Sequence, residues 1–214
     1  MGAAMDVHEF STATITKIGV GTFGNNAYLL HCRSTGAQLL IDAAADQDRL
    51  LELVGRGFAG NRFALQILTT HQHADHWQAL GDVVEKTGAV TLAGRDDAAG
   101  IPIVTDRLLD HGDVVLVGEL ELTVIVLRGH TPGSIALAFE DQDGKNILFT
   151  GDSLFPGGIG KTGSPAAFAS LIEDVSTRIF DRYTDDTWFF PGHGDDSTLG
   201  RERPHLNEWR TRGW

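Results

Sequence analysis

Short stretches in which apolar side chains dominate or alternate with polar ones recur along the whole chain and are typical of β-strands. They cover residues 14–20, 26–32, 37–43, 63–70, 89–94, 113–118, 120–127, 134–141, 145–151 and 187–192. Helical spacing of apolar residues separates some of these strands, at residues 45–57, 75–88 and 164–183. Ser164 before Pro165 is a typical helix start, and Gly57 and Gly88 are typical helix ends. The pattern predicts a strand-rich α/β protein.

The order of these elements suggests two similar halves. Antiparallel-looking strands are followed by two strand-helix units in residues 1–109, and the order is repeated in residues 110–200. We find no linker, low-complexity segment or short-period repeat between the halves. We therefore predict a single domain, residues 1–214, in which two sheets carry helices on their outer faces. A short helix and a tail are expected at residues 198–214.

The charge and composition exclude several classes of protein. With 29 acidic and 17 basic residues the formal charge is -12, which disfavours binding to nucleic acid and to anionic membranes. No apolar stretch reaches the roughly 18 residues needed to span a bilayer, and residues 1–10 do not resemble a signal peptide. We expect a cytoplasmic protein, with His8 in a mobile end. The single cysteine, Cys32, lies in a predicted strand and is expected to be a small core residue.

Residues 68–77, LTTHQHADHW, place three histidines and an aspartate directly behind an apolar run. Imidazole nitrogens and carboxylate oxygens suit zinc, iron or manganese, whereas the alternative is a solvated loop. His130 in RGHTPGS, Asp152 in TGDSLF and His193 in PGHGDD also follow predicted strands. Side chains at the carboxyl ends of strands can converge at one edge of the sheets. The sequence therefore predicts a metal site there.

The motifs HQHADH, GHTPGS, GDSLF and PGHG, in this order, resemble the metallo-β-lactamase fold superfamily. With LLIDAAAD around Asp42, the resemblance extends from about residue 14 to residue 194 and implies a four-layer αβ/βα sandwich. It implies that one metal is held by His71, His73 and His130, a second by Asp75, His76 and His193, and that Asp152 bridges them. Asp42 is implied to orient a ligating histidine, the alternative being a simple turn aspartate.

The implied chemistry is metal-assisted hydrolysis. Two divalent ions, expected to be zinc with iron or manganese as alternatives, can activate a hydroxide between them and polarise a carbonyl or phosphoryl oxygen. Asp75 and Asp152 are the predicted catalytic carboxylates, and Asp75 can accept or relay a proton while it ligates.

The run GDSLFPGGIGKTGS resembles glyoxalase II and its close relatives, in which a basic residue at the place of Lys161 receives the carboxylate of a glutathione thioester. This implies a small anionic hydroxyacyl thioester as the substrate. Three features depart from that pattern. Gly163 stands where a tyrosine is expected, Trp77 and Gln78 replace a glycine-rich pair, and the helical tail domain of glyoxalase II has no counterpart here.

Other functions remain as alternatives. Relatives resembling persulfide dioxygenases share these motifs but use one iron, implied here at His71, His130 and Asp152, and hydrolysis of a lactone or phosphodiester is also compatible. A purely structural or sensory metal site is disfavoured, because structural zinc sites are usually closed cages of four ligands. True β-lactamases of the superfamily use a cysteine or lack the bridging carboxylate at the place of Asp152. The roles of His205 and the tail, and the oligomeric state, stay open.

Overall fold

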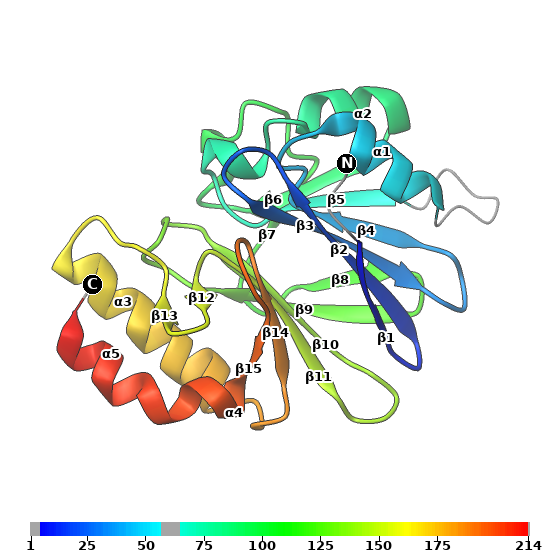
Figure 1. Ribbon diagram of the computed structural model, residues 1–214. Helices are drawn as coiled ribbons and strands as arrows, with labels where there is room; N and C mark the ends of the chain where they lie inside the picture. The colour runs from blue at the N-terminus through cyan, green and yellow to red at the C-terminus, as the bar shows by residue number, and fades with distance from the viewer. Residues whose placement is uncertain (1–4, 57–64, 214) are drawn as a thin grey trace.

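Two β-sheets pack face to face in the computed structural model, which describes residues 5–56 and 65–213 (Figure 1). The first sheet contains, in spatial order, β1 (Asp6–Glu9), β2 (Ala13–Val20), β3 (Asn25–Cys32), β4 (Gln38–Ile41), β5 (Leu65–Thr69), β6 (Val90–Gly94) and β7 (Arg107–Leu109). Strands β1 to β4 pair antiparallel, and β4 to β7 pair parallel. The predicted strand at 63–70 begins in residues that lie outside the described ranges.

The second sheet is mostly antiparallel. Its spatial order is β15 (Ser197–Thr198), β14 (Trp188–Pro191), β11 (Asn146–Gly151), β10 (Ile135–Glu140), β9 (Leu120–Val126) and β8 (Val114–Val117), and only β11 and β14 pair parallel. A separate hairpin is formed by β12 (Leu154–Phe155) and β13 (Gly158–Ile159). In residues 110–213 one helix lies between β11 and β14, and further helices follow β15.

Helices cover the outer face of each sheet (Figure 1). The α-helices among the described residues are α1 (Gln47–Arg56) and α2 (Leu80–Thr87) on the first sheet, and α3 (Pro165–Val175), α4 (Leu199–Glu202) and α5 (Leu206–Arg212) near the second. Ser164 caps α3 by accepting a hydrogen bond from the Ala167 amide, and Gly88 ends α2 with a φ of 67°, as predicted. Gly57 lies outside the described residues. The predicted helix at 164–183 is divided into two parts, α3 and the π-helical turn Ser176–Phe180 that follows it.

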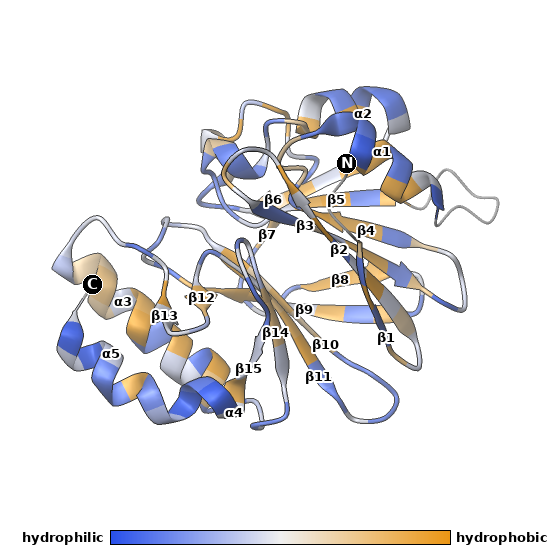
Figure 2. Cartoon of the chain, in the orientation of Figure 1, coloured by the Kyte–Doolittle hydropathy of each residue, from blue (hydrophilic) through white to orange (hydrophobic). Residues whose placement is uncertain are grey.

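The alternation of side chains along the strands explains the layers. In β3, Tyr28 and Leu30 point into the core between the sheets, while Ala27 and Leu29 pack toward the helices. Three buried clusters result, one between the sheets and one between each sheet and its helices. Figure 2 shows hydrophobic residues along many of the strands and hydrophilic residues along much of α2 and α5. The predicted four-layer αβ/βα sandwich is confirmed.

The expectation of a mobile end at His8 is wrong. His8 lies in β1, which pairs with β2 along its whole length. Its ring packs edge-on against Phe190, with 5.0 Å between the ring centroids. The stretch is too short for apolar and polar residues to alternate clearly, so no strand was predicted there. No helix in the described residues is both long enough and apolar enough to cross a membrane.

Candidate metal centre

The side chains predicted to bind metal lie in loops at one end of the sandwich. Residues 71–76 follow β5, His130 follows β9, Asp152 follows β11 and His193 follows β14. These loops begin at the carboxyl ends of strands from both sheets, so the polar side chains meet where the two sheets open toward solvent. The structure thus brings together residues that are far apart in the sequence.

The donor atoms form two adjacent groups. In the first group, Nδ1 of His73 lies 3.0 Å from Nε2 of both His71 and His130, and those two Nε2 atoms are 3.2 Å apart. In the second group, Oδ2 of Asp75 lies 3.3 Å from Nε2 of His193 and 3.7 Å from Nε2 of His76. These distances are close enough for each group to surround a single ion.

Asp152 lies between the two groups. Its Oδ1 is 3.5 Å from Nε2 of His76, and its Oδ2 is 3.5 Å from Nε2 of His193 and 3.7 Å from Nε2 of His130. The close packing behind it needs glycine, because a Cβ at Gly192 would lie 2.2 Å from Oδ1 of Asp152. A carboxylate in this place can contact ions in both groups.

Hydrogen bonds on the far side of the rings fix their orientation. Nδ1 of His130 donates to the carbonyl oxygen of Lys161 at 2.8 Å, and Nδ1 of His193 donates to that of Phe23 at 3.3 Å. Nδ1 of His76 donates to Oδ2 of Asp42 at 2.8 Å. Because a carbonyl or carboxylate oxygen can only accept here, Nδ1 carries the proton and the Nε2 lone pair of each ring points inward.

The electrostatics of the site fit bound cations. Burial, reinforced by the neighbouring histidines, holds the pKa of His71 well below its usual value, so the ring is neutral and able to ligate. Oδ1 of Asp152 is buried without a hydrogen-bond partner, which is costly for a carboxylate oxygen unless a cation compensates it. Burial tends to lower the pKa of His76, but Asp42 and Asp152 raise it to about 10. The proton that this pKa implies would sit on Nε2 of His76, which is the atom that could bind a metal ion instead.

Asp42 is almost fully buried at the end of β4 and has a positive φ of 59°, which aspartate tolerates better than most residues. Its carboxylate accepts from the Thr70 amide at 2.7 Å and from the Thr70 hydroxyl at 2.8 Å, in addition to His76. Thr70 directly precedes His71, so this one carboxylate contacts the loop at both ends.

Asn25 and Asn26 belong to the site but were not predicted. Nδ2 of Asn25 donates to Oδ2 of Asp75 at 3.0 Å and lies 3.2 Å from Nε2 of His193. Nδ2 of Asn26 donates to the carbonyl oxygens of Pro191 and Gly194, each at 2.9 Å. The only sequence signal was two adjacent amides at the start of a strand that is otherwise apolar.

The side chain of Lys161 is exposed, and its backbone carbonyl is the part that contacts the ligand group. Beside it lies a cavity of about 380 Å³, lined by Thr162, Gly163, Ser164, Pro165, Phe168 and Gly213. Trp77, which departs from the expected glycine, donates from Nε1 to the carbonyl oxygen of Gln72 at 2.9 Å. The departure therefore supports the loop that carries the histidines.

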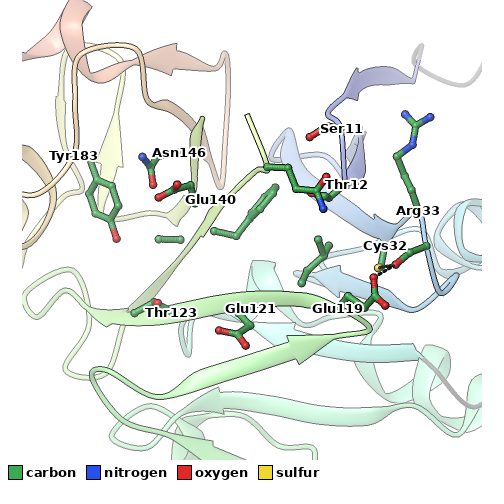
Figure 3. A pocket seen from close by; sticks show the side chains of 15 residues that line it. Ser11, Thr12, Cys32, Arg33, Glu119, Glu121, Thr123, Glu140, Asn146 and Tyr183 are labelled. Carbon is green, nitrogen blue, oxygen red and sulfur yellow. Dashed lines mark hydrogen bonds between the residues drawn. The ribbon is translucent and has the colours of Figure 1, made fainter. Parts of the chain in front are cut away.

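Two other features lie outside this centre. Asp6, His8 and Asp196 approach one another, but the Lys17 ammonium is 2.7 Å from Asp196 and already supplies the positive charge. A cavity of about 810 Å³ lies at the other end of β3 and β11, where Cys32 and Asn146 line it (Figure 3). Burial tends to raise the pKa of the Cys32 thiol, but hydrogen bonds with Ser34 and Thr35 lower it to about 7.

The sequence pattern that defines the metallo-beta-lactamase superfamily matches residues 20–193. The chain belongs to this superfamily. Members of this superfamily bind divalent metal, and the ligand groups above suit that role.

The chain is also similar to three individual proteins. It is 38% identical over 150 residues to a hydroxyacylglutathione hydrolase from Fuscovulum blasticum, covering 69% of this chain and 56% of that protein. The structure of ETHE1 from Myxococcus xanthus is 26% identical with a TM-score of 0.73, covering 98% of this chain and 85% of the other. The structure of TTHA1623 in a di-iron-bound form is 30% identical with a TM-score of 0.68, covering 87% of this chain and 96% of the other. The chain spans a little over half the length of the hydroxyacylglutathione hydrolase.

Proposed function

We propose that this protein is a dinuclear metal-dependent hydrolase of hydroxyacyl thioesters. The observation that carries the proposal is the pair of ligand groups with the buried, unpartnered Oδ1 of Asp152 between them. Likeness to a hydroxyacylglutathione hydrolase supports the substrate class, and likeness to a protein solved with two irons supports two metals.

In this proposal each metal has its own set of side chains. His71, His73 and His130 would hold the first ion, Asp75, His76 and His193 would hold the second, and Asp152 would contribute to both. Bound divalent ions would supply Lewis acidity, which lowers the pKa of water and polarises the thioester carbonyl. Zinc is the expected ion for this set of imidazoles and carboxylates, with iron and manganese as alternatives.

The two carboxylates have different environments, which suggests different tasks. The side chain of Asp152 is 12% exposed and lies between the groups, whereas that of Asp75 is 29% exposed. Burial tends to raise the pKa of Asp75, but the hydrogen bond from Asn25 and the nearby His76 hold it below its usual value. Asp75 is therefore ionised and accessible, and we assign it the role of accepting a proton from the attacking water.

The substrate is proposed to be anionic. Lys161 is exposed next to the His130 loop and can receive a carboxylate, while the adjacent cavity of about 380 Å³ offers space for the thiol portion. Gly163 lines this cavity in place of the tyrosine of glyoxalase II. We propose that this opening accommodates a thiol carrier that need not be glutathione.

A second candidate is a mononuclear iron oxygenase that acts on persulfides. The specific observation in its favour is the likeness to ETHE1 together with the proximity of His71, His130 and Asp152. This candidate leaves the second group, Asp75, His76 and His193, without a metal. Metal stoichiometry therefore separates the two candidates.

The test combines metal analysis with a substrate panel. The purified protein, loaded separately with zinc, iron or manganese, is assayed with lactoyl-glutathione, other hydroxyacyl thioesters, a lactone and a phosphodiester, and oxygen uptake is followed with glutathione persulfide. We expect two metal equivalents and thioester cleavage. One equivalent of iron with oxygen uptake would favour the oxygenase instead, and two metals without cleavage of any thioester would contradict the proposed substrate class.

A histidine pair provides the matched control. The variant His73→Ala is expected to lose metal and thioesterase activity together, because His73 contacts both other members of the first group. His31→Ala changes a histidine near the opposite end of β3 and should leave both properties unchanged. Equal losses in the two variants would contradict the assignment of His73.

A further inference from the structure

Asp97 is a fully buried carboxylate in the loop that follows β6. It stands immediately before the short helical turn Ala98–Gly100, in the position where an aspartate usually accepts a hydrogen bond from its own helix. That bond is not made. The carboxylate is instead directed toward other segments of the chain.

Those segments are the two loops that carry the first ligand group. Oδ2 of Asp97 accepts from the backbone amide of Gln72 at 3.0 Å, and Gln72 lies between His71 and His73. The same carboxylate accepts from the hydroxyl of Thr131 and, through Oδ1, from the amide of Gly133 at 2.7 Å. Thr131 directly follows His130. One side chain therefore contacts a direct sequence neighbour of every histidine in the group.

The packing around these bonds is tight on both sides. A Cβ at Gly133 would lie 2.5 Å from the backbone nitrogen of Asp97, so the loop after His130 could not approach with a larger residue. A Cβ at Gly100 would lie 2.2 Å from Oε1 of Gln72. The loop of residues 94–100 thus contacts both ligand loops closely and leaves them little freedom to move apart.

We propose that Asp97 is a positioning residue that sets the spacing of the metal ligands His71, His73 and His130. Its three hydrogen bonds hold the loop from the first sheet at a fixed distance from the loop of the second sheet. Neutral substitution leaves at least one of these buried donors without an acceptor, which loosens that spacing. The inference rests on the metal ligands of the proposed function but not on its substrate.

The test measures metal affinity in Asp97→Asn, which keeps the shape of the side chain. Co²⁺ is titrated against a chromophoric chelator, and the visible absorption of the bound Co²⁺ is recorded. Since loss of partners that orient metal ligands typically lowers affinity about 10- to 100-fold, we expect a loss of that size for one of the two Co²⁺ equivalents. The absorption bands of that ion should shift, while the equivalent held by Asp75, His76 and His193 stays near its wild-type affinity.

Asp141→Asn is the matched control. Asp141 is also buried and also accepts from amides and hydroxyls, those of Ser11 and Thr12, but it lies away from the metal centre. This variant should lose stability and keep the Co²⁺ affinity and spectrum of the wild type. If Asp97→Asn behaves in the same way, Asp97 is only a structural residue and the proposal is overturned.

Thr131 gives a second measurement that does not depend on the folding of Asp97→Asn. Thr131→Val removes the hydroxyl donor and should weaken the same Co²⁺ equivalent, by less than Asp97→Asn does. Thr131→Ser keeps the hydroxyl and should restore wild-type affinity. Equal affinity in Thr131→Val and Thr131→Ser contradicts the positioning role.

A wild-type protein that binds no Co²⁺ overturns the proposed metal centre as well. Inactivity toward thioesters with intact Co²⁺ binding affects the substrate proposal alone.

Discussion

The carboxylate of Asp42 accepts a hydrogen bond from Nδ1 of His76 at 2.8 Å, and both side chains are almost fully buried. This bond leaves Nε2 of His76 directed toward Asp75 and Asp152. Since Asp42 also binds the backbone amide and hydroxyl of Thr70, it couples the orientation of a proposed ligand to the exit of β5.

Asp42→Asn should weaken the second metal group, because its amide would face His76 or Thr70 with a donor where an acceptor is needed. We expect an affinity loss of about 10- to 100-fold for one metal equivalent. Unpaired buried donors should also lower the free energy of unfolding by about 1–3 kcal/mol. Zn²⁺ competition titration and urea unfolding of the metal-free protein measure the two effects. Unchanged metal affinity in a folded variant would contradict the orienting role.

Asn25→Ala should also act on the second metal group, through Asp75. Its amide holds Oδ2 of Asp75, and the alanine leaves that carboxylate free to rotate away. A loss of about tenfold in metal affinity is expected, at the lower end of such effects. Asn146→Ala, at the beginning of β11 and far from the centre, is the control in the same Zn²⁺ titration. An equal loss in both variants would count against a specific contact with Asp75.

Lys161→Ala should raise KM for an anionic thioester and leave kcat and metal content unchanged. The side chain is exposed, and the backbone carbonyl that binds His130 is retained in the variant. An exposed ion pair predicts an increase in KM of only about two- to fivefold. Steady-state kinetics with an anionic and a neutral thioester, beside Lys145→Ala, provide the measurement. A similar KM for both substrates in the variant and the wild type would exclude an anion site at Lys161.

Asp141 should make the stability of the metal-free protein depend on acid pH. Burial tends to raise its pKa, but hydrogen bonds from Ser11, Thr12 and Gln142 lower it to about 2. Because the pKa is about 3.9 in an unfolded chain, the stabilisation is fully present above that pH and is lost as the pH falls toward 2. The difference in unfolding free energy between the wild type and Asp141→Asn should therefore shrink over this range. A difference that is the same at pH 5 and at the lowest pH where both proteins fold would contradict this assignment.

The proposed metal ligands could be located from sequence because they occur in short motifs directly after apolar strands. His71, His73, Asp75 and His76 share one loop, and the periodicity of the flanking residues showed where that loop begins. Asn25 and Asp97 have no such motif. Asn25 meets His193 across 168 positions, and Asp97 meets Thr131 across 34. Their contacts depend on which loops the tertiary packing brings together, and a single sequence does not record that.

The same limit applies to the fold. The long strands were predicted because alternation is visible over five or more residues, as in β2 and β3. Strands such as β7, β12 and β13 contain two or three residues and exist only because a neighbour supplies their hydrogen bonds. The π-helical turn after α3 was missed for a related reason, since the spacing of its apolar residues does not distinguish it from an α-helix.

The contact between Asn25 and His193 also bears on the order in which the protein is made. The amide of Asn25 is synthesised before the imidazole of His193, and 168 positions separate the two residues in the chain. During synthesis the other proposed metal ligands are therefore present in the chain before His193. A translation product that ends before residue 193 therefore lacks one of the three side chains of the second proposed metal group, Asp75, His76 and His193.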